Sequence, residues 1–393
     1  MVKALLLKCC VSIVAAALWL PSIHLFFPVD IADYRAPTGV APKARMLAEQ
    51  HLSLWRDPVR REQSLASMQA INPEWDFMSR TYFVLALANM ALRDASYRDD
   101  ACEIIDAIIA DTLRIEQEKG QTYFLLDYAH VGPWIHPTGR SIFVDGEIVL
   151  MMAARRFVRE DLRYKKPMHV RVRLMIEQME QSPVLSAESY PDQCWLFCNT
   201  VGLAAIRMVD VLDGSDHSEF LRRWVQTARR QLTNAKTGLL ISSYSHNGTP
   251  DPSGACPEGS SIFMSAHMLD IVDPEYARDQ YNRAAQGLRR SFLGFGYAQE
   301  WAEGCTSRGD VDSGPIVPFL DASAGASGMA VLGASAFEDT PYLQSLLRSL
   351  EFAAFPRQEG ERLEYRASNA VGDAVLLYAL VQGPLWARIK ERI

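Results

Sequence analysis

The chain of 393 residues is 49% apolar and 22% charged, so it can bury a large core and is not a disordered or low-complexity protein. With 40 Lys+Arg against 47 Asp+Glu, its net charge of -7 argues against a nucleic-acid-binding protein. Seven cysteines are too few for a small disulfide scaffold. Motifs of the CxxC, HExxH, Walker A, GxGxxG and GxSxG types are missing. Zincins, P-loop NTPases, standard dehydrogenases and α/β-hydrolases are therefore disfavoured. Cys194 and Cys198 are four residues apart without a second ligand pair of matching spacing, so we expect no metal.

The N-terminus predicts a membrane anchor. Lys3 and Lys8 are followed by an apolar run over residues 9–27, which is long enough to cross ~30 Å of hydrocarbon. Asp30 and Asp33 come after it. Lysines before the run and acids after it predict a single span in the inner membrane with the body on the periplasmic, extracytoplasmic side.

A cleaved signal peptide is the alternative, but its apolar region would be shorter. Here Trp19 and Leu20 continue the run past its alanines, which favours an uncleaved anchor. We divide the chain into an anchor over residues 1–30, a linker over 31–45 and one domain over 46–393.

Two kinds of helix alternate in the domain. The first kind is apolar along its whole length, as expected of a helix buried on all sides, and the second is amphipathic. The apolar helices are expected at 77–92, 142–154, 195–212, 260–271, 322–332 and 369–380. The amphipathic helices are expected at 99–118, 169–181, 218–232, 274–293 and 341–352.

This alternation predicts an all-α fold, an (α/α)6 barrel in which six helical hairpins form a closed toroid. An irregular helical domain and an open solenoid are the alternatives. The segments that lead into the apolar helices are rich in Gly, Pro, acids and aromatics, whereas the opposite connections are short turns. We expect these segments to meet at one mouth of the barrel, where binding and catalysis would concentrate.

Glu147 is the first candidate for chemistry at this mouth. It lies in the apolar stretch FVDGEIVLMMAARRF, so burial would raise its pKa and suit it to general acid or base catalysis. The alternative is an ordinary helix-terminal charge. Its neighbour Asp145 looks like a helix cap.

The stretch ESYPDQCWLFCN gives two further candidates. Pro191 before Asp192 and an apolar helix after it predict an N-cap or first-turn acid at Asp192. Cys198, in the next helical turn, could act as a nucleophile or acid, or it could be a buried apolar cysteine.

Other mouth residues could bind substrate. Glu258, Asp310 and Asp312 add carboxylates, a pattern found in carbohydrate-cleaving sites, and His136 is the one histidine in a mouth segment. Aromatic side chains could form a sugar platform or the wall of an apolar pocket; these are Trp75, Trp134, Tyr190, Trp195, Tyr244 and Trp301. Cys256 and Cys305 lie in different mouth segments and could form a disulfide in an oxidising compartment.

The stretch from Glu188 to Leu293 resembles the linalool dehydratase/isomerase family. The likeness rests on a Pro-Asp pair, a Cys-Asn pair seven residues on, the turn DVLDGSD, the Ser-Tyr that ends at Tyr244 and the start of a helix at IVDPEYARDQY. The resemblance implies an (α/α)6 barrel and a cofactor-independent enzyme that adds or removes water on an apolar alcohol. It also implies a homo-oligomeric ring in which a neighbouring subunit helps to close the site.

The resemblance also points to particular residues. The family's catalytic cysteine in the Cys-Asn pair falls on Cys198, its second catalytic cysteine on Ser189 and its catalytic histidine on Glu147. The nearest counterpart of its N-terminal aspartate is Asp76. Glutamate for histidine can preserve proton transfer, and serine for cysteine keeps a less acidic donor.

Three functions follow from these features. The first is a membrane-anchored lyase or isomerase that acts on an apolar alcohol or alkene, with Glu147 as acid or base and Cys198, near Asp192, as proton donor. The second is a glycan-active hydrolase or lyase on the same barrel. The third is a non-catalytic binding scaffold.

Overall fold

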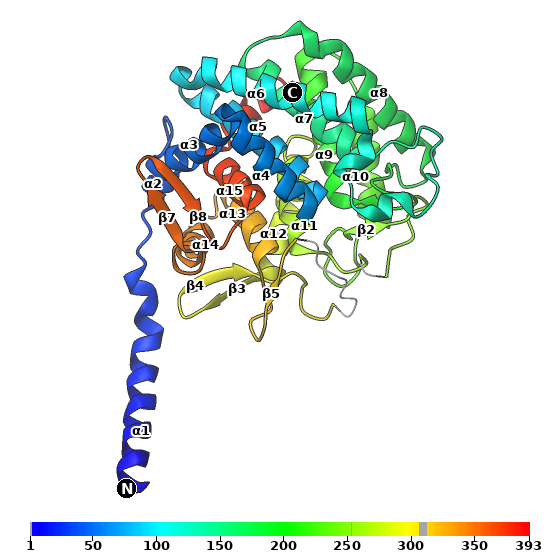
Figure 1. Ribbon diagram of the computed structural model, residues 1–393. Helices are drawn as coiled ribbons and strands as arrows, with labels where there is room; N and C mark the ends of the chain where they lie inside the picture. The colour runs from blue at the N-terminus through cyan, green and yellow to red at the C-terminus, as the bar shows by residue number, and fades with distance from the viewer. Residues whose placement is uncertain (1, 253, 306–312) are drawn as a thin grey trace.

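The computed structural model describes residues 2–252, 254–305 and 313–393, and its body is mostly helical (Figure 1). The N-terminal helix α1 (Val2–Trp19) and the short helix η1 (Leu20–Phe26) leave the body as one apolar rod without buried residues. Together they are long and apolar enough to cross a membrane, a property that signal sequences share.

Six buried helices pack side by side in a closed ring, in which each contacts the next and the last contacts the first. They are α5 (Pro73–Arg93), α7 (Ile142–Val158), α9 (Leu196–Asp213), α11 (Gly259–Leu269), α13 (Ala324–Ala336) and α15 (Ala370–Val381). Every residue of α7 is buried. These are the six apolar helices that the sequence predicts, with ends shifted by a few residues.

A second helix follows each helix of the ring. These are α6 (Arg98–Lys119), α8 (Lys165–Gln181), α10 (Ser218–Gln231), α12 (Pro274–Leu288), α14 (Thr340–Ala353) and α16 (Pro384–Lys390). α6 packs on α5 and α7, and α8 packs on α7 and α9. Their burial is one-sided, as the amphipathic pattern predicts.

Local sequence sets where the ring helices begin and end. Asn72 caps α5 by accepting a hydrogen bond from the backbone N–H of Glu74, and Pro73 occupies the first helical position. Helix α9 ends at Gly214, whose φ of 70° is a left-handed conformation that glycine adopts without strain.

The expected all-α class needs one correction, because short antiparallel ribbons join some of the helices. The predicted helix 274–293 ends at Leu288, and the chain continues into β3 (Arg289–Phe292), which pairs with β4 (Phe295–Ala298). In the sequence RRSFLGFGYA, aromatic residues alternate with small ones along β4, and the chain turns at Leu293-Gly294, both with positive φ. The other ribbons are β1 (Cys194–Trp195) with β2 (Ser243–Tyr244), β5 (Ile316–Val317) with β6 (Ala322–Ser323), and β7 (Pro356–Glu359) with β8 (Arg362–Tyr365).

The segment expected as a linker packs on the body. Helix α2 (Ile31–Tyr34) buries Tyr34, whose hydroxyl donates to Glu351 at 2.5 Å. Helix α3 (Pro42–Arg56) begins inside the same segment and packs on α15, and α4 (Pro58–Ile71) packs on α5. The apolar N-terminal helix is therefore joined to a part of the chain that is fixed to the ring.

Candidate active site

A cavity of ≈ 630 Å³ lies at the N-terminal ends of the six ring helices. Every ring helix contributes side chains to its wall, mostly aliphatic or aromatic. The wall includes Trp75 and Met78 of α5, Phe143 of α7, Phe197 and Cys198 of α9, Ser260 and Ser261 of α11, Met329 and Val331 of α13, and Val371, Asp373 and Leu376 of α15. The segments that precede the ring helices therefore meet at one mouth.

Cys198 lies in the first turn of α9, lines the cavity and is 7% exposed. Burial raises the pKa of its thiol well above the usual range, although a hydrogen bond with Ser189 acts in the opposite direction. The charge on Glu74 raises it further, as does Glu147 when that carboxyl is ionised. At neutral pH Cys198 is consequently a neutral thiol rather than a thiolate nucleophile.

The chain before α9 holds Ser189 in place. The backbone N–H of Ser189 donates to the carbonyl of Gln193 at 2.8 Å, and its own carbonyl accepts from the Ser141 hydroxyl at 2.7 Å. Asn199, next to Cys198, bonds to both the N–H and the carbonyl of Ala187, at 2.9 and 3.0 Å. These bonds tie the segment with Ser189 to the start of α9.

Glu147 lies one helical turn after Phe143 on α7, so it sits deeper in the ring than the cavity wall. It is 1% exposed, and its carboxyl accepts a hydrogen bond from the Thr81 hydroxyl at 2.6 Å. Burial raises its pKa to about 8, against the opposing effect of the Thr81 hydrogen bond. The carboxyl is therefore mostly protonated at neutral pH. Tyr82, also buried, interacts electrostatically with both Glu147 and Cys198.

Glu74 adds a second carboxyl that interacts electrostatically with Cys198, and this one lines the same cavity. It accepts a hydrogen bond from the Tyr190 hydroxyl. Burial and the charge on Glu74 raise the pKa of Tyr190 well above its usual range, so the phenol stays a donor. The Tyr128 ring lies 4.0 Å from that of Tyr190 and extends this aromatic wall.

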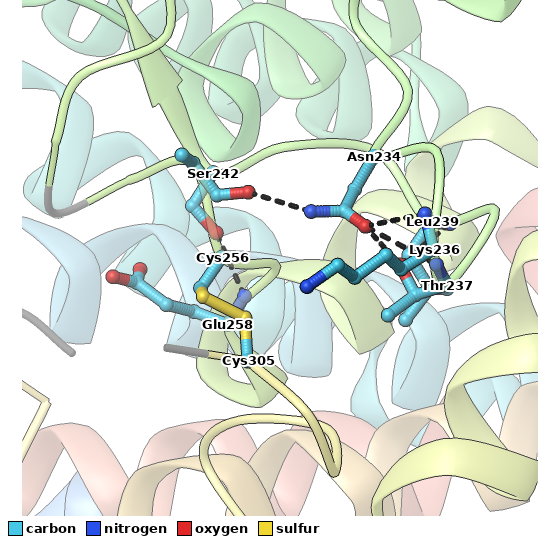
Figure 2. The surroundings of a disulfide bond; sticks show 9 residues. Asn234, Lys236, Thr237, Leu239, Ser242, Cys256, Glu258 and Cys305 are labelled. Atoms are coloured by element: carbon cyan, nitrogen blue, oxygen red, sulfur yellow. Dashed lines mark hydrogen bonds between the residues drawn. A yellow bond between two sulfur atoms is a disulfide. The ribbon is translucent and has the colours of Figure 1, made fainter. Parts of the chain in front are cut away.

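The opposite wall carries Glu258 and Glu300, which also line the cavity. Glu300 accepts hydrogen bonds from the hydroxyls of Ser260 and Ser323, both at 2.5 Å, and from the Ser260 N–H at 3.0 Å. Figure 2 shows Glu258 two residues beyond Cys256, with its N–H donated to the Ser242 hydroxyl at 2.8 Å.

A disulfide joins Cys256 to Cys305, with 5.8 Å between their Cα atoms (Figure 2). It links the segment before α11 to the one before α13, and the Gly259 N–H also donates to the Glu300 carbonyl at 2.7 Å. The two acids of this wall are thus held by backbone that is cross-linked beside them.

Asp373, in the first turn of α15, is a further carboxyl of the cavity wall. Burial raises its pKa to about 7, although hydrogen bonds with Ser368 and the Tyr365 N–H lower it. Its Oδ1 is buried and has no hydrogen-bond partner among the described residues.

The structure brings part of the predicted site together. Cys198, Trp75, Tyr190, Trp195 and Glu258 line the cavity, while Ser189 and Glu147 contact or approach Cys198 from behind the wall.

Asp192 does not fit its prediction as a cap or first-turn acid of α9. It is exposed, it adopts a left-handed φ of 53°, and α9 begins only at Leu196 with Trp195 as its N-cap. Its carboxylate accepts from the His246 N–H at 3.1 Å, so it ties the turn between Tyr190 and Gln193 to the segment that follows β2. Pro191 marked this turn, which the sequence interpretation assigned to the helix.

The other predicted residues lie outside the cavity wall. Asp76 pairs with Arg80 at 2.9 Å, which in turn bonds to Asp111 of α6, so its carboxylate faces the outer layer. His136 is buried beside Thr138, and the Tyr244 hydroxyl bonds to Ser186 Oγ at 2.9 Å.

Trp134 packs against the hydrophobic core, and Trp301 lines a smaller neighbouring pocket with Glu303. Asp310 and Asp312 lie outside the described residues.

Sequence reasoning missed Glu74, Glu300, Asp373 and Tyr82. Glu74 and Asp373 each lie within four residues of a helix start, where an acid usually complements the helix dipole, so the sequence offers no sign of a cavity. Glu300 lies in an irregular segment next to Trp301. This pair of an acid and an aromatic residue could have indicated a binding residue.

Comparison with known proteins identifies the family. The linalool dehydratase/isomerase family profile matches residues 143–371, more than half of the chain. The chain belongs to the linalool dehydratase/isomerase family. The matched region of this family includes Glu147, Ser189 and Cys198, the three positions at which the resemblance predicts catalytic residues. In the structure, Ser189 forms a hydrogen bond with the Cys198 thiol and Glu147 interacts with it electrostatically.

A crystal structure described as a possible member of the GH105 family from Klebsiella pneumoniae is also similar to this linalool dehydratase/isomerase family member. The two share 14% sequence identity with a TM-score of 0.49, over 79% of this chain and 81% of the other.

Proposed function

We propose that this protein is a membrane-anchored lyase or isomerase that uses acid–base chemistry, without a cofactor, on an apolar alcohol or alkene. The observation that carries the proposal is Cys198, a thiol kept protonated by burial in the wall of a mostly apolar cavity. An apolar substrate would be bound by the aromatic and aliphatic part of the wall. A small number of polar groups in the same wall would orient the substrate hydroxyl.

In the dehydration direction, the Cys198 thiol donates its proton to the substrate hydroxyl, which leaves as water. The Glu74 carboxylate takes a proton from the adjacent carbon, and the two electrons of that C–H bond form the alkene. Transfer of this proton from Glu74 to the Cys198 thiolate restores the starting state. In the reverse direction the same groups add water.

Glu147 would assist from behind the wall. Because its carboxyl is mostly neutral at pH 7, it does not repel the thiolate that forms on Cys198 as a carboxylate would. Ser189, bonded to the same sulfur, would stabilise that thiolate through its hydroxyl.

We further propose that the closed ring with its outer helices is an (α/α)6 barrel and that the catalytic domain lies outside the cytoplasm. The exposed apolar helix Val2–Phe26 supports a membrane anchor. The Cys256–Cys305 disulfide supports an oxidising compartment for the body.

The test uses the full-length protein with a lipid extract and, separately, a periplasmic glycan extract, each analysed by mass spectrometry. We expect apolar alcohols or alkenes to lose or gain one water. Cys198→Ala should lower the rate by roughly 10²–10⁴-fold, the usual contribution of an acid–base group. Cys102→Ala, at a buried free cysteine of α6, is the matched control and should leave the rate unchanged. Equal rates for the two variants would refute the role of Cys198.

A glycan-active enzyme is the second candidate, because Glu74, Glu258 and Glu300 share the cavity with Trp75 and Trp195. Two carboxylates on either side of a sugar and an aromatic platform are what glycoside cleavage needs. New sugar ends in the glycan extract that disappear in Glu300→Gln would favour this function. No variant-sensitive change in either extract would favour a binding scaffold.

A further inference from the structure

The cavity reaches the molecular surface at the β5–β6 ribbon. Val317 of β5 lines the cavity and is 49% exposed. Tyr297 of β4 and Leu350 and Ala353 of α14 line the same end of the cavity. This opening is therefore framed by two β-ribbons and the end of an outer helix.

The elements around the opening have large apolar side chains that are exposed to solvent. Phe319, in the turn between β5 and β6, is fully exposed, and Phe292 of β3 is 53% exposed. Phe352 and Phe355, at the end of α14 and just before β7, are exposed as well. Large aromatics gathered at one opening are expensive to leave in water. We call these four phenylalanines and Val317 the aromatic rim.

The apolar N-terminal helix ends on the same elements. The Phe27 ring, next to η1, lies 5.1 Å from Phe352 and 6.1 Å from Phe295 of β4. A Cβ added at Gly294, in the β3–β4 turn, would lie 2.5 Å from the His24 ring. In Figure 1, α1 leaves the body on the side of β3, β4 and β5, and the β5–β6 turn extends in the same direction as α1.

We propose that the aromatic rim docks on the lipid bilayer that α1 spans, so that the cavity opens onto the membrane and an apolar substrate enters from the lipid. The bilayer is the occupant that the structure favours because the membrane span ends against the rim itself. Aromatic side chains are stable at the headgroup level, where an apolar body meets a polar boundary. This inference rests on the proposed membrane anchorage.

The test places a tryptophan at the rim and measures contact with lipid. The full-length protein is reconstituted in vesicles of phosphatidylcholine and phosphatidylglycerol, with or without bromine atoms on the acyl chains as fluorescence quenchers. Phe319→Trp and Val317→Trp are compared with the parent, so that the emission of the eight native tryptophans is subtracted. Leu162→Trp is the matched control, because Leu162 is exposed and follows the opposite end of α7.

We expect the brominated lipid to remove most of the added emission of Phe319→Trp and Val317→Trp and none of that of Leu162→Trp. Equal quenching at all three positions, or none at the rim, would overturn the inference. Extraction of the same vesicles with alkaline carbonate separates the two levels of failure. A chain that is washed out refutes the anchor and with it the rim, whereas a retained chain with an unquenched rim refutes the docking alone.

Discussion

Two carboxyl groups on α7, Asp145 and Glu147, are only two residues apart and equally buried, each with 1% exposure. Asp145 faces the outer layer, where it forms ion pairs with Arg140, at 2.6 Å, and with Arg171. Glu147 faces the ring interior, where its carboxyl accepts a hydrogen bond from the Thr81 hydroxyl. Residues i and i+2 of an α-helix are ~200° apart around its axis, so Asp145 and Glu147 face opposite sides of α7.

The difference shows that burial alone does not decide the charge of an acid. Between α6, α7 and α8, two arginines compensate the desolvation of Asp145 and Glu116. Inside the ring, Glu147 forms no ion pair with any residue that the structure describes, and burial raises its pKa to about 8. In the outer layer the ionised carboxylate of Asp145 stabilises the fold through ion pairs. Inside the ring the carboxyl of Glu147 stays protonated at neutral pH.

The largest expected effect is on the free energy of unfolding when Asp145, the residue that faces the outer layer, is changed. Asp145→Asn leaves Arg140 and Arg171 with a weaker partner in a buried site, so we expect a loss of about 3–5 kcal/mol in the free energy of unfolding. Glu147→Gln, the matched change on the other face, replaces a mostly neutral group and should cost far less. Urea unfolding of the full-length protein in detergent measures both, and similar losses would contradict the contrast.

The pH dependence of stability should come from the interior acid. The folded-state pKa of Glu147 lies above its unfolded value, near 4.5, so the folded state binds more protons between these values and loses stability as the pH rises towards 8. Compared with Glu147→Gln, the parent should lose about 1.4 kcal/mol per pH unit in this window. Unfolding titrations of both proteins from pH 5 to 9 give this slope. Parallel curves would show that Glu147 is ionised in the folded protein.

The smallest expected effect is on the pKa of Glu147 when Thr81, whose hydroxyl partly stabilises the ionised carboxylate, is changed. Thr81→Val removes that hydrogen bond, so the pKa of Glu147 should rise further, by up to ~1 unit for a bond worth about 0.5–1.5 kcal/mol. Isotope-edited infrared or carboxyl NMR titration measures it. Thr112→Val, which removes a buried hydroxyl from α6, is the control. A lower pKa in Thr81→Val would contradict the role assigned to Thr81.

The sequence predicted the ring and the interior acid because both depend on hydrophobic pattern. A helix that is apolar on every side must be buried, and an acid in such a helix, as at Glu147, must be desolvated. Asp192 was assigned wrongly because a proline followed by an acid marks a turn as readily as a helix start. Glu74 and Asp373 look like ordinary first-turn acids until closure of the ring brings six helix ends together.

The Cys256–Cys305 disulfide makes one side of the cavity depend on oxidation. Its cysteines are 49 residues apart in the chain and fasten the wall with Glu258 and Glu300, whereas the wall with Cys198 and Glu147 is held by hydrogen bonds and packing. Reducing conditions would therefore remove the covalent link of the wall with Glu258 and Glu300 and leave the hydrogen bonds on the side of Cys198 in place. With the body outside the cytoplasm, as we propose, oxidation in that compartment would complete the cavity.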